Sequence, residues 1–365
     1  MTKLPFVLGA LVLVAVVAEC RVKRHSDDTL ELVHVIFRHG DRTPDKSVIY
    51  KNDPYINVTY YPIGHGQLTN AGKRKEYQIG KALRKRYHTF LGEFTLDTVD
   101  SRCTDYNRTK MSLQLVLASL FPPTGEHVWQ EQLNWQPVPF NYWPVEEDHV
   151  LADPMKNCPK YRTAFFDYLL SPEAKDMYTN FTELHNYLEQ HTGQLLHSKS
   201  FAELYFTLTT EHENGYTMPE WAAKVYPQIK HLAIMDYNVS TSTPQLKRLA
   251  SGFLAKKILD DTVAKTKGDK YKDTKVFLYS AHESNVAHLL RFLGIFYDHV
   301  PPYGSYLTIE VHNQEDTRGF KVFYQDYSSD KPKKYKLPNC GIFCPVDKFE
   351  ALYKELLPES EQECF

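Results

Sequence analysis

Short apolar runs occur near both ends of the chain, and polar residues that favour turns follow each of them. Residues 29–37, TLELVHVIF, are apolar and β-branched, which is typical of a buried strand. Residues 274–281, TKVFLYSA, have the same character. Residues 305–312 and 319–327 form a strand pair joined by the polar turn NQEDTRG. The pattern therefore predicts a sheet assembled from the two ends of the chain.

Two segments with helical periodicity follow the first strand. Residues 68–87, LTNAGKRKEYQIGKALRKRY, predict a helix with Thr69 as its N-cap. Residues 104–121, TDYNRTKMSLQLVLASLF, predict a second helix capped by Thr104 or Asp105. Apolar residues on one face at helical spacing are Ile79, Leu83 and Tyr87 in the first helix and Met111, Leu115 and Ala118 in the second.

The middle of the chain, residues 130–240, is rich in helical patterns broken by Pro, Gly and aromatic clusters such as NWQPVPFNYWP. Strand patterns then return, and residues 283–294, ESNVAHLLRFLG, predict a helix that ends at its glycine. Strand–helix alternation at both ends with a helical middle predicts an α/β fold. We expect a core formed by residues 25–129 and 241–365, with residues 130–240 inserted as an α-helical cap beside a cleft.

The overall charge excludes some classes of partner. The 365 residues include 43 Lys and Arg against 45 Asp and Glu. A chain with this balance has no bulk cationic field to attract nucleic acid or anionic membranes. We therefore expect no nucleic-acid partner.

The N-terminus predicts a secretory signal peptide over residues 1–20. Lys3 precedes an unbroken run of apolar and small residues, 4–18, that is shorter than a comfortable membrane span. Cleavage could follow Ala18 or Cys20, and a short signal anchor is the alternative. The C-terminal residues carry no apolar tail that would signal a lipid anchor. We expect a soluble protein, secreted or lysosomal, without a membrane anchor.

Cysteine usage agrees with export. Cys340 and Cys344 stand four apart in the loop NCGIFCP, where a small disulfide fits. Cys158 and Cys364 could form a second bridge, which leaves Cys103 as a buried thiol. No CxxC pair or HxxxH spacing occurs, so we expect no metal site.

Four Asn-X-Ser/Thr sequons mark candidate glycosylation sites in an exported chain. They lie at Asn57, Asn107, Asn180 and Asn238. Asn107 is the doubtful one, because it lies in a segment that we expect near the functional site.

Candidate chemistry appears at three places where a strand or loop ends beside basic residues. These places are RHG with Arg42, SRCTD with Arg102, and SAHES with His282. In open α/β sheets, ligands collect outside the carboxyl ends of strands, where helix N-termini favour anions. Phosphate fits well, because Arg side chains bind its oxygens in pairs.

The motifs RHGDRTP, GHGQLTNAG, SRCTDYNRTKMS, NCP, YSAHES and VPPYGSYLTIEVH occur in one order across nearly the whole mature chain. Together they resemble the histidine acid phosphatase family, in particular its exported prostatic, lysosomal and insect-venom members. The resemblance implies a phosphoglycerate-mutase-like α/β core with a helical cap, a phosphomonoester substrate, no cofactor, and a homodimer.

The resemblance also implies residue roles. His39 would be the nucleophile and become a phosphohistidine. Arg38, Arg42 and Arg102 would hold the phosphoryl oxygens, and His282 would add a fourth donor. An imidazole must be uncharged to attack. Three guanidinium groups around it disfavour its protonation, so we expect the pKa of His39 to be lowered.

The general acid departs from the family pattern. The family usually has Asp directly after the second His, whereas this chain has Glu283. Glu offers the same carboxyl chemistry on one more methylene, and we expect it to protonate the leaving alcohol. The alternative is a helix-start carboxylate that only complements the helix dipole.

Two other functions remain open at this point. A phytase-like inositol polyphosphate phosphatase would keep the RHG motif but need further Lys and Arg around the cleft. A catalytically quiet secreted protein of venom or saliva would act by binding. The intact basic motif argues against the second, and the Glu at position 283 is the one feature in its favour.

Overall fold

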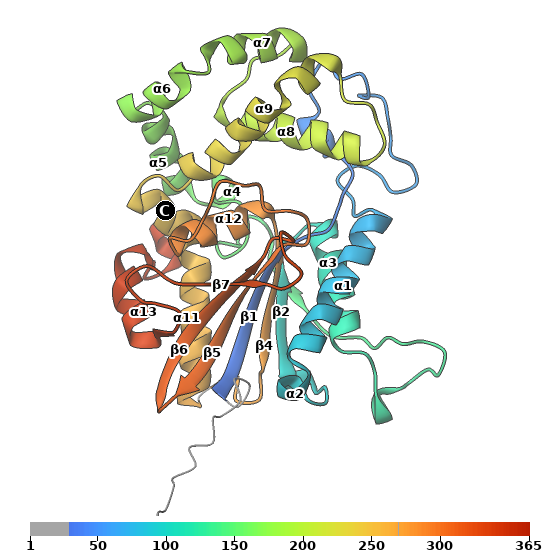
Figure 1. The fold of residues 1–365 in the computed structure, drawn as a ribbon, viewed down its shortest axis with the longest axis vertical. Coiled ribbons are helices and arrows are strands. Elements are labelled where there is room, and N and C mark those ends of the chain that lie inside the picture. Colours follow the sequence, from blue (N-terminus) through green and yellow to red (C-terminus); the bar gives the residue numbers. More distant parts are fainter. Residues whose placement is uncertain (1–28, 269) are drawn as a thin grey trace, which may run out of the picture.

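The computed structural model describes residues 29–268 and 270–365, so the predicted signal peptide lies outside it (Figure 1). One central sheet has the strand order β3-β2-β4-β1-β5-β6-β7, with β8 paired to β6. The strands are β1 (Leu30–Arg38), β2 (Val99–Cys103), β3 (Asn141–Tyr142), β4 (Val276–Ala281), β5 (Tyr306–Gln314), β6 (Thr317–Gln325), β7 (Lys333–Tyr335) and β8 (Cys344–Pro345). The fold is α/β, as the sequence pattern predicts.

Strands from both ends of the chain lie side by side in the sheet. β1 pairs in parallel with β4 and antiparallel with β5, and β4 pairs in parallel with β2. Arg38, the last residue of β1, is in register with Ala281, the last residue of β4. The backbone N–H of His39 donates to the carbonyl of Ala281 over 3.0 Å. This register brings His39 and His282 together at one edge of the sheet.

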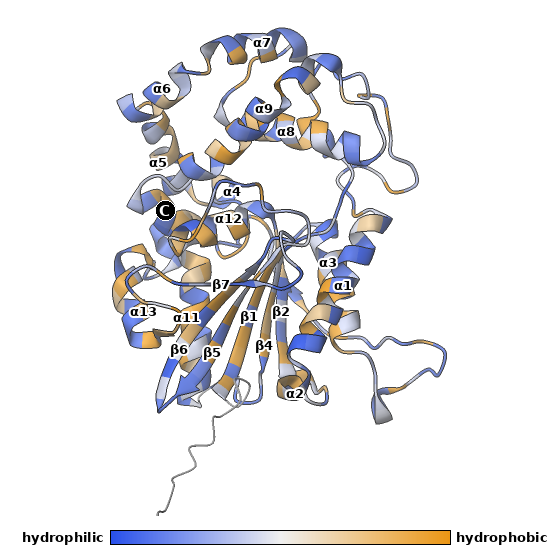
Figure 2. Ribbon diagram, in the orientation of Figure 1, coloured by the Kyte–Doolittle hydropathy of each residue, from blue (hydrophilic) through white to orange (hydrophobic). Residues whose placement is uncertain are grey.

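Helices cover both faces of the sheet because the strands alternate their apolar side chains between the faces. On β1, Val33, Val35 and Phe37 pack with one set of helices, whereas Leu32 and Ile36 pack with the other. The first set is α1 (Asn70–Arg86), α2 (His88–Leu91) and α3 (Asn107–Leu120). The second is α11 (Phe253–Lys267), α12 (Glu283–Phe292) and α13 (Val346–Tyr353). Figure 2 shows hydrophobic residues concentrated along the central strands.

A second layer of helices lies beyond the sheet edge that carries His39 (Figure 1). It consists of α5 (Pro159–Leu169), α6 (Pro172–Thr179), α7 (Thr182–Thr192), α8 (Ser198–Glu213) and α9 (Glu220–Val239). These helices bury a core of their own, in which Phe201 and Leu208 of α8 pack with Ile229 and Leu232 of α9. The short helices α4 (Pro154–Asn157) and α10 (Pro244–Lys247) lie at either end of this segment.

One short strand falls within the range expected to be helical cap. β3 lies between residues 130 and 240, yet Asn141 and Tyr142 pair in register with Arg102 and Cys103 of β2. The segment before α4 therefore extends the sheet, and the helical layer begins only after it. The sequence did not predict β3, because a strand of two residues in an aromatic-rich segment is too short to give a strand pattern.

The two predicted helices form, but the buried face of the second differs from the expected stripe. The Thr69 hydroxyl caps α1 by accepting from the Gly72 N–H over 3.1 Å, as predicted. In α3, Met111, Leu115 and Ala118 instead line a partly open pocket of about 420 Å³. The buried side chains of α3 are Thr109, Ser112, Leu113, Val116, Leu117, Ser119 and Leu120.

Two small polar residues lie on the buried face of α3 together with its core leucines and valine. A Cβ at Gly80 of α1 would lie 2.0 Å from the Ser119 hydroxyl, so the two helices approach closely at this point. The backbone N–H of Gly40 donates to the Ser112 hydroxyl. The serines therefore belong to the packed face, which a search for apolar residues alone overlooks. The N-cap position is Tyr106 rather than Thr104 or Asp105.

Both predicted disulfides are present. Cys158–Cys364 joins the start of α5 to the C-terminus, with a Cα–Cα distance of 4.5 Å. Cys340–Cys344 closes the small loop, and Cys103 is buried without a disulfide partner in the part of the chain that the structure describes. Among the residues described, no helix combines the length and apolarity needed to cross a bilayer.

The four sequons lie in different environments. Asn57 and Asn180 are exposed, at a turn and at the end of α6. Asn107 is exposed at the start of α3, but Thr109 of its sequon is fully buried. Asn238 lies within α9, where its side-chain oxygen accepts a hydrogen bond from Arg291.

Candidate active site

Two imidazole rings meet at the carboxyl ends of β1 and β4. The ring centroids of His39 and His282 are 5.5 Å apart, and the rings are inclined at 77°. His39 follows the last residue of β1, and His282 is the N-cap of α12. The sequence placed these residues at two strand ends, and the parallel register of the strands brings them together.

The hydrogen bonds of His39 define which ring nitrogen is free to react. Nδ1 lies 2.8 Å from the carbonyl oxygen of Gly40. Since a carbonyl oxygen can only accept, the neutral ring carries its proton on Nδ1. Nε2 is therefore unprotonated, and its lone pair accepts from Nε–H of Arg108 over 3.2 Å.

The surroundings of His39 disfavour its protonated form. Burial, followed by the charges of Arg108, His282, Arg38 and Arg42, lowers the pKa of His39 well below 6.5. Gly40 allows this tight arrangement, because a Cβ there would lie 2.6 Å from the Gly72 carbonyl oxygen. The ring therefore stays uncharged below the usual histidine pKa.

Arg38 is a buried cation with unused donor capacity. Its Nη1 donates to the Pro301 carbonyl over 2.6 Å, and its guanidinium lies 3.8 Å from the ring centroid of Tyr303. Its Nη2 has no hydrogen-bond partner among the described residues. A buried cationic N–H without a partner is costly, so the geometry favours an anionic guest at this point.

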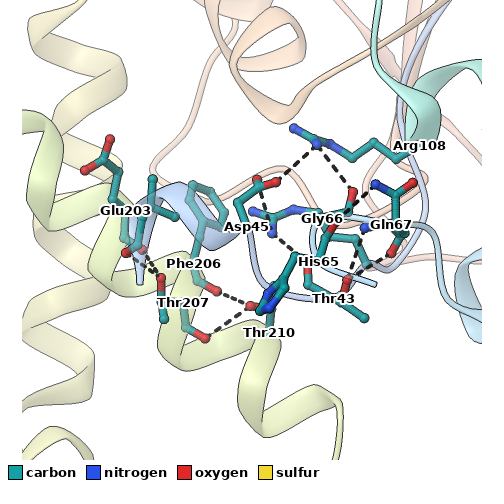
Figure 3. A network of polar contacts seen from close by, with 12 residues as sticks. Thr43, Asp45, His65, Gly66, Gln67, Arg108, Glu203, Phe206, Thr207 and Thr210 are labelled. Carbon is teal, nitrogen blue, oxygen red and sulfur yellow. Dashed lines mark hydrogen bonds and ion pairs between the residues drawn. The ribbon is translucent and has the colours of Figure 1, made fainter. Parts of the chain in front are cut away.

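Arg42 and Arg108 are joined by one carboxylate. Nη1 of Arg42 lies 3.4 Å from Oδ2 of Asp45, and Nη1 of Arg108 lies 3.4 Å from Oδ1 of the same residue. Figure 3 shows Arg108 extending toward Asp45 and the carbonyl of Gly66. Nη1 of Arg42 also donates to the Thr43 carbonyl over 3.0 Å.

Arg102 does not join this cluster, contrary to the expectation from sequence. It is in register with Tyr279, whose side chain packs on the α11–α12 face of the sheet. Its guanidinium donates to Asp148 over 2.7 Å and lies 4.0 Å from the ring centroid of Trp143. The side-chain alternation of β2 therefore turns Arg102 toward the opposite face from Cys103, which packs against α3.

Arg108 is the site residue that the sequence analysis missed. It lies in the first turn of α3, directly after the end of β2, where anion ligands collect in such sheets. The segment SRCTDYNRT contains two arginines, and only the second follows the strand end. Position relative to that strand end was the signal that could have identified Arg108.

His282 is held as a neutral ring. Its Nε2 lies 2.9 Å from the Thr104 hydroxyl, which itself donates to Thr109. Nε2–H of His282 is therefore the donor to Thr104, and the ring accepts from the Asn285 N–H as a helix cap. Burial and then the charge of Arg108 lower the pKa of His282 well below 6.5.

Glu283 reaches the cluster from the first turn of α12. Its Oε2 lies 3.4 Å from Nε of Arg38, and its side chain is 19% exposed. The carboxyl therefore borders both the buried guanidinium and solvent. No group of three or more His, Cys, Asp or Glu suited to a metal ion occurs among residues 29–268 and 270–365.

Comparison with known proteins agrees with this arrangement. Residues 29–325 match the histidine phosphatase superfamily (branch 2). The chain is 37% identical to the venom acid phosphatase Acph-1 of Apis mellifera over 91% of its own length and 87% of the relative. It is 31% identical to the prostatic acid phosphatase of Homo sapiens, with 90% and 86% covered. For the lysosomal acid phosphatase of Rattus norvegicus the identity is 30%, with 99% and 84% covered.

Solved structures share the fold at lower identity. The phytase of Klebsiella sp. ASR1 superposes with a TM-score of 0.66 at 16% identity, covering 92% of this chain and 99% of that structure. The multiple inositol polyphosphate phosphatase of Bifidobacterium longum in complex with phosphate gives a TM-score of 0.60 at 11% identity, with 92% and 94% covered. With the family match over most of the chain, these comparisons show that the protein belongs to branch 2 of the histidine phosphatase superfamily.

Proposed function

We propose that the protein is an acid phosphatase that hydrolyses phosphate monoesters through a phosphohistidine at His39. One observation carries the proposal: the unprotonated Nε2 of His39 faces the cationic group of Arg108, while Nδ1–H is held by the Gly40 carbonyl. A phosphoryl group approaching Nε2 would therefore have its negative oxygens beside a guanidinium. The acid phosphatases among the relatives support this reaction.

In the first step, Nε2 of His39 forms a bond to phosphorus as the ester P–O bond breaks. Arg38, Arg42 and Arg108 would hold the phosphoryl oxygens and offset their charge, which is most of what phosphoryl transfer requires. The leaving alcohol oxygen takes a proton from the Glu283 carboxylic acid. The phosphorylated ring keeps its Nδ1 proton, and the Gly40 carbonyl stabilises the positive charge that develops on the ring.

In the second step, water attacks phosphorus from the side that the alcohol has left. Glu283, now a carboxylate, accepts a proton from this water as the P–N bond breaks. Inorganic phosphate forms and His39 returns to its neutral state. In the ligand-free arrangement, Nε2–H of His282 donates to the Thr104 hydroxyl. With a phosphoryl group bound, the same N–H would donate both to Thr104 and to a phosphoryl oxygen.

Activity at acidic pH follows from these groups. The pKa of His39 is lowered, so the ring stays uncharged and nucleophilic at pH values below the usual histidine pKa of about 6.5. The leaving alcohol must also receive a proton in the first step, which acidic solution favours. Both requirements favour turnover on the acidic side of neutrality.

The surroundings favour a substrate with one phosphate over an inositol polyphosphate. Asp45 and Glu283 lie among the arginines. Glu213 is close enough to Arg38 and Arg42 for their charges to lower its pKa, although burial raises that pKa on balance. These carboxylates would repel additional phosphate groups. The phytases among the structural neighbours establish the shared fold and leave the substrate of this chain to experiment.

Hydrolysis assays test the proposal. We expect turnover of a chromogenic aryl phosphate between roughly pH 4 and 8 to be highest at the acidic end and unaffected by a chelator. Phytate should be a poor substrate under the same conditions. An enzyme that needs a metal and works best at alkaline pH would overturn the mechanism. Faster release of phosphate from phytate would favour the inositol polyphosphate alternative.

We also infer a homodimer formed through the β3 edge of the sheet. β3 is the terminal strand of the sheet, and among the described residues no strand pairs with its other backbone edge. Large apolar side chains are exposed in this strand and on either side of it in the chain: Val128, Trp129, Leu133, Trp135, Tyr142 and Trp143. Exposed aromatic clusters of this kind are typical of protein interfaces. Light scattering should give twice the mass of one chain, and a monomer at micromolar concentration would exclude this surface as a stable interface.

Export and glycosylation complete the proposal. The relatives include a venom, a prostatic and a lysosomal acid phosphatase. We expect glycans at the exposed Asn57 and Asn180, and none at Asn238, because its side chain is bonded to Arg291 within a helix. Peptide mass spectrometry before and after enzymatic deglycosylation identifies the occupied sites.

A further inference from the structure

Asp45 stands at a helix N-cap but does not cap the helix. It precedes a single 3-10 turn, Lys46–Val48, and its side chain makes no hydrogen bond to that turn. Asp at such a position usually accepts from the first backbone N–H groups. Here the carboxylate is turned the other way, and each of its oxygens lies 3.4 Å from a guanidinium nitrogen.

The chain leaves room for the Asp45 carboxylate in this position. A Cβ at Gly66 would lie 2.2 Å from Oδ1 of Asp45, so only glycine is compatible with this placement. Gly66 has a φ of +67° and donates its N–H to the Pro44 carbonyl over 2.8 Å. Its own carbonyl oxygen lies 3.4 Å from Nη1 of Arg108 (Figure 3). The turn that contains Gly66 therefore fits around both Asp45 and Arg108.

Asp45 offsets a repulsion inside the site. Burial lowers the pKa of Arg108, the Asp45 carboxylate raises it, and the neighbouring Arg42 lowers it again. The guanidinium groups of Arg42 and Arg108 repel each other, and the Asp45 carboxylate between them offsets this repulsion. In the ligand-free site the anion is Asp45. During the proposed reaction it is the phosphoryl group.

We propose that Asp45 is a positioning residue: its carboxylate holds Arg42 and Arg108 together in the ligand-free site and competes with bound phosphate for them. The inference rests on the proposed function and adds a product-release device to it. A fixed negative charge beside the phosphate site weakens the binding of every phosphoryl group, including the product. Asp45 would thereby lower the affinity of the site for phosphate, so that the product leaves readily, while it keeps the two arginines ordered.

The variant Asp45→Asn tests this role, because it removes the charge and keeps the shape of the side chain. We expect the competitive inhibition constant of inorganic phosphate to fall by about threefold or more, with KM for an aryl phosphate falling alongside and kcat not rising. Asp45→Glu, which restores the charge, should lie closer to wild type than Asn does. An inhibition constant that is unchanged or increased in Asp45→Asn overturns the proposal.

Matched variants separate this effect from general changes in charge or folding. Asp105→Asn removes an acid that pairs with Lys110 rather than with an arginine of the site, and it should leave the inhibition constant unchanged. If Asp45→Asn does not fold, Asp45→Ser, which also removes the charge but leaves a smaller polar side chain, provides the same measurement. Failure of the proposed function would appear as an inactive wild type, whereas failure of this inference would appear as an active wild type with an unchanged phosphate inhibition constant in the variant.

Discussion

In the proposed reaction His39 acts through one ring nitrogen, and two polar neighbours determine which one. The Gly40 carbonyl fixes the proton on Nδ1, and the Arg108 guanidinium faces Nε2. A carboxylate in place of that carbonyl would stabilise the protonated ring and raise its pKa. Burial and then the surrounding cations have the opposite effect: they lower the pKa of His39, so the ring stays uncharged at acidic pH.

Arg108 and Arg102 provide a paired test of the site at residue level. We expect Arg108→Lys to lower kcat/KM by about a hundredfold or more, because lysine cannot keep two donors on the phosphoryl group. Arg102→Lys should change kcat/KM by less than about threefold. Steady-state kinetics on an aryl phosphate measures both.

The stability of the two variants should differ in the reverse order. Arg102 is buried, is hydrogen-bonded to Asp148 and stacks on Trp143. Its replacement by lysine weakens both contacts, so we expect the melting temperature to fall by several degrees. If Arg102→Lys instead abolished phosphate binding while Arg108→Lys retained it, the assignment of the two arginines would be reversed.

These two residues also show what the sequence can and cannot predict about the site. Arg38, His39, Arg42, His282 and Glu283 could be placed from motifs at strand ends, and the strand register brings them to one edge. The choice between Arg102 and Arg108 depends on the face to which β2 turns its side chains. A five-residue strand with polar residues on both faces gives no alternation from which that face can be read.

At the scale of elements, the loop between β1 and α1 packs against α8, and the carboxyl groups of Asp53 in the loop and Glu211 in α8 interact there. Asp53 and Glu211 are 3% and 2% exposed. Burial, followed by the hydrogen bond to Asp53 and its charge, raises the pKa of Glu211 to about 9. The pair therefore shares a proton in the folded protein. Of the other groups around it, the Tyr50 and Tyr60 hydroxyls are buried without a hydrogen-bond partner among the described residues.

This pair makes the folded state less stable as pH rises. Glu211 ionises near pH 4.5 in the unfolded chain but only near 9 in the fold, so the folded state binds more protons between these values. We expect the melting temperature to fall across this window and to fall less steeply in Glu211→Gln, which stays neutral. Thermal unfolding at a series of pH values measures the slope.

The matched control for this prediction is Glu220→Gln, at the exposed first position of α9. It removes one carboxylate from the same layer and should leave the slope of melting temperature against pH as in wild type. Parallel curves for wild type and Glu211→Gln would show that Asp53 and Glu211 do not share a proton in the folded protein.

Helices were easier to predict from sequence than their faces. α1 begins at its predicted cap because Thr69 has a backbone N–H to accept from and an apolar stripe follows. In α3 the predicted stripe of Met111, Leu115 and Ala118 is only partly buried, whereas the core face carries Leu113, Val116, Leu117 and Leu120. Apolar residues stand at helical spacing on both faces, so periodicity alone does not reveal which face is buried.

At the scale of the molecule, the sheet and the helical layer each contribute to the site. The sheet supplies His39 and His282, which follow the carboxyl ends of β1 and β4. From α8, Phe206 lies 5.5 Å from the guanidinium of Arg38, and Asn214, directly after α8, donates to the Arg42 carbonyl over 3.0 Å. The Cys158–Cys364 disulfide joins the start of the helical layer to the end of the chain. The site therefore depends on how the two layers are held together.

Trapping the phosphorylated enzyme tests the central claim most directly. Rapid acid-free quenching of wild-type protein with a labelled phosphate ester, followed by peptide mass spectrometry, should place an acid-labile, base-stable phosphoryl group on Nε2 of His39. His39→Ala should carry no label and have no turnover, while retaining the wild-type melting profile. A phosphoryl group on another residue, or wild-type turnover in His39→Ala, would contradict the account.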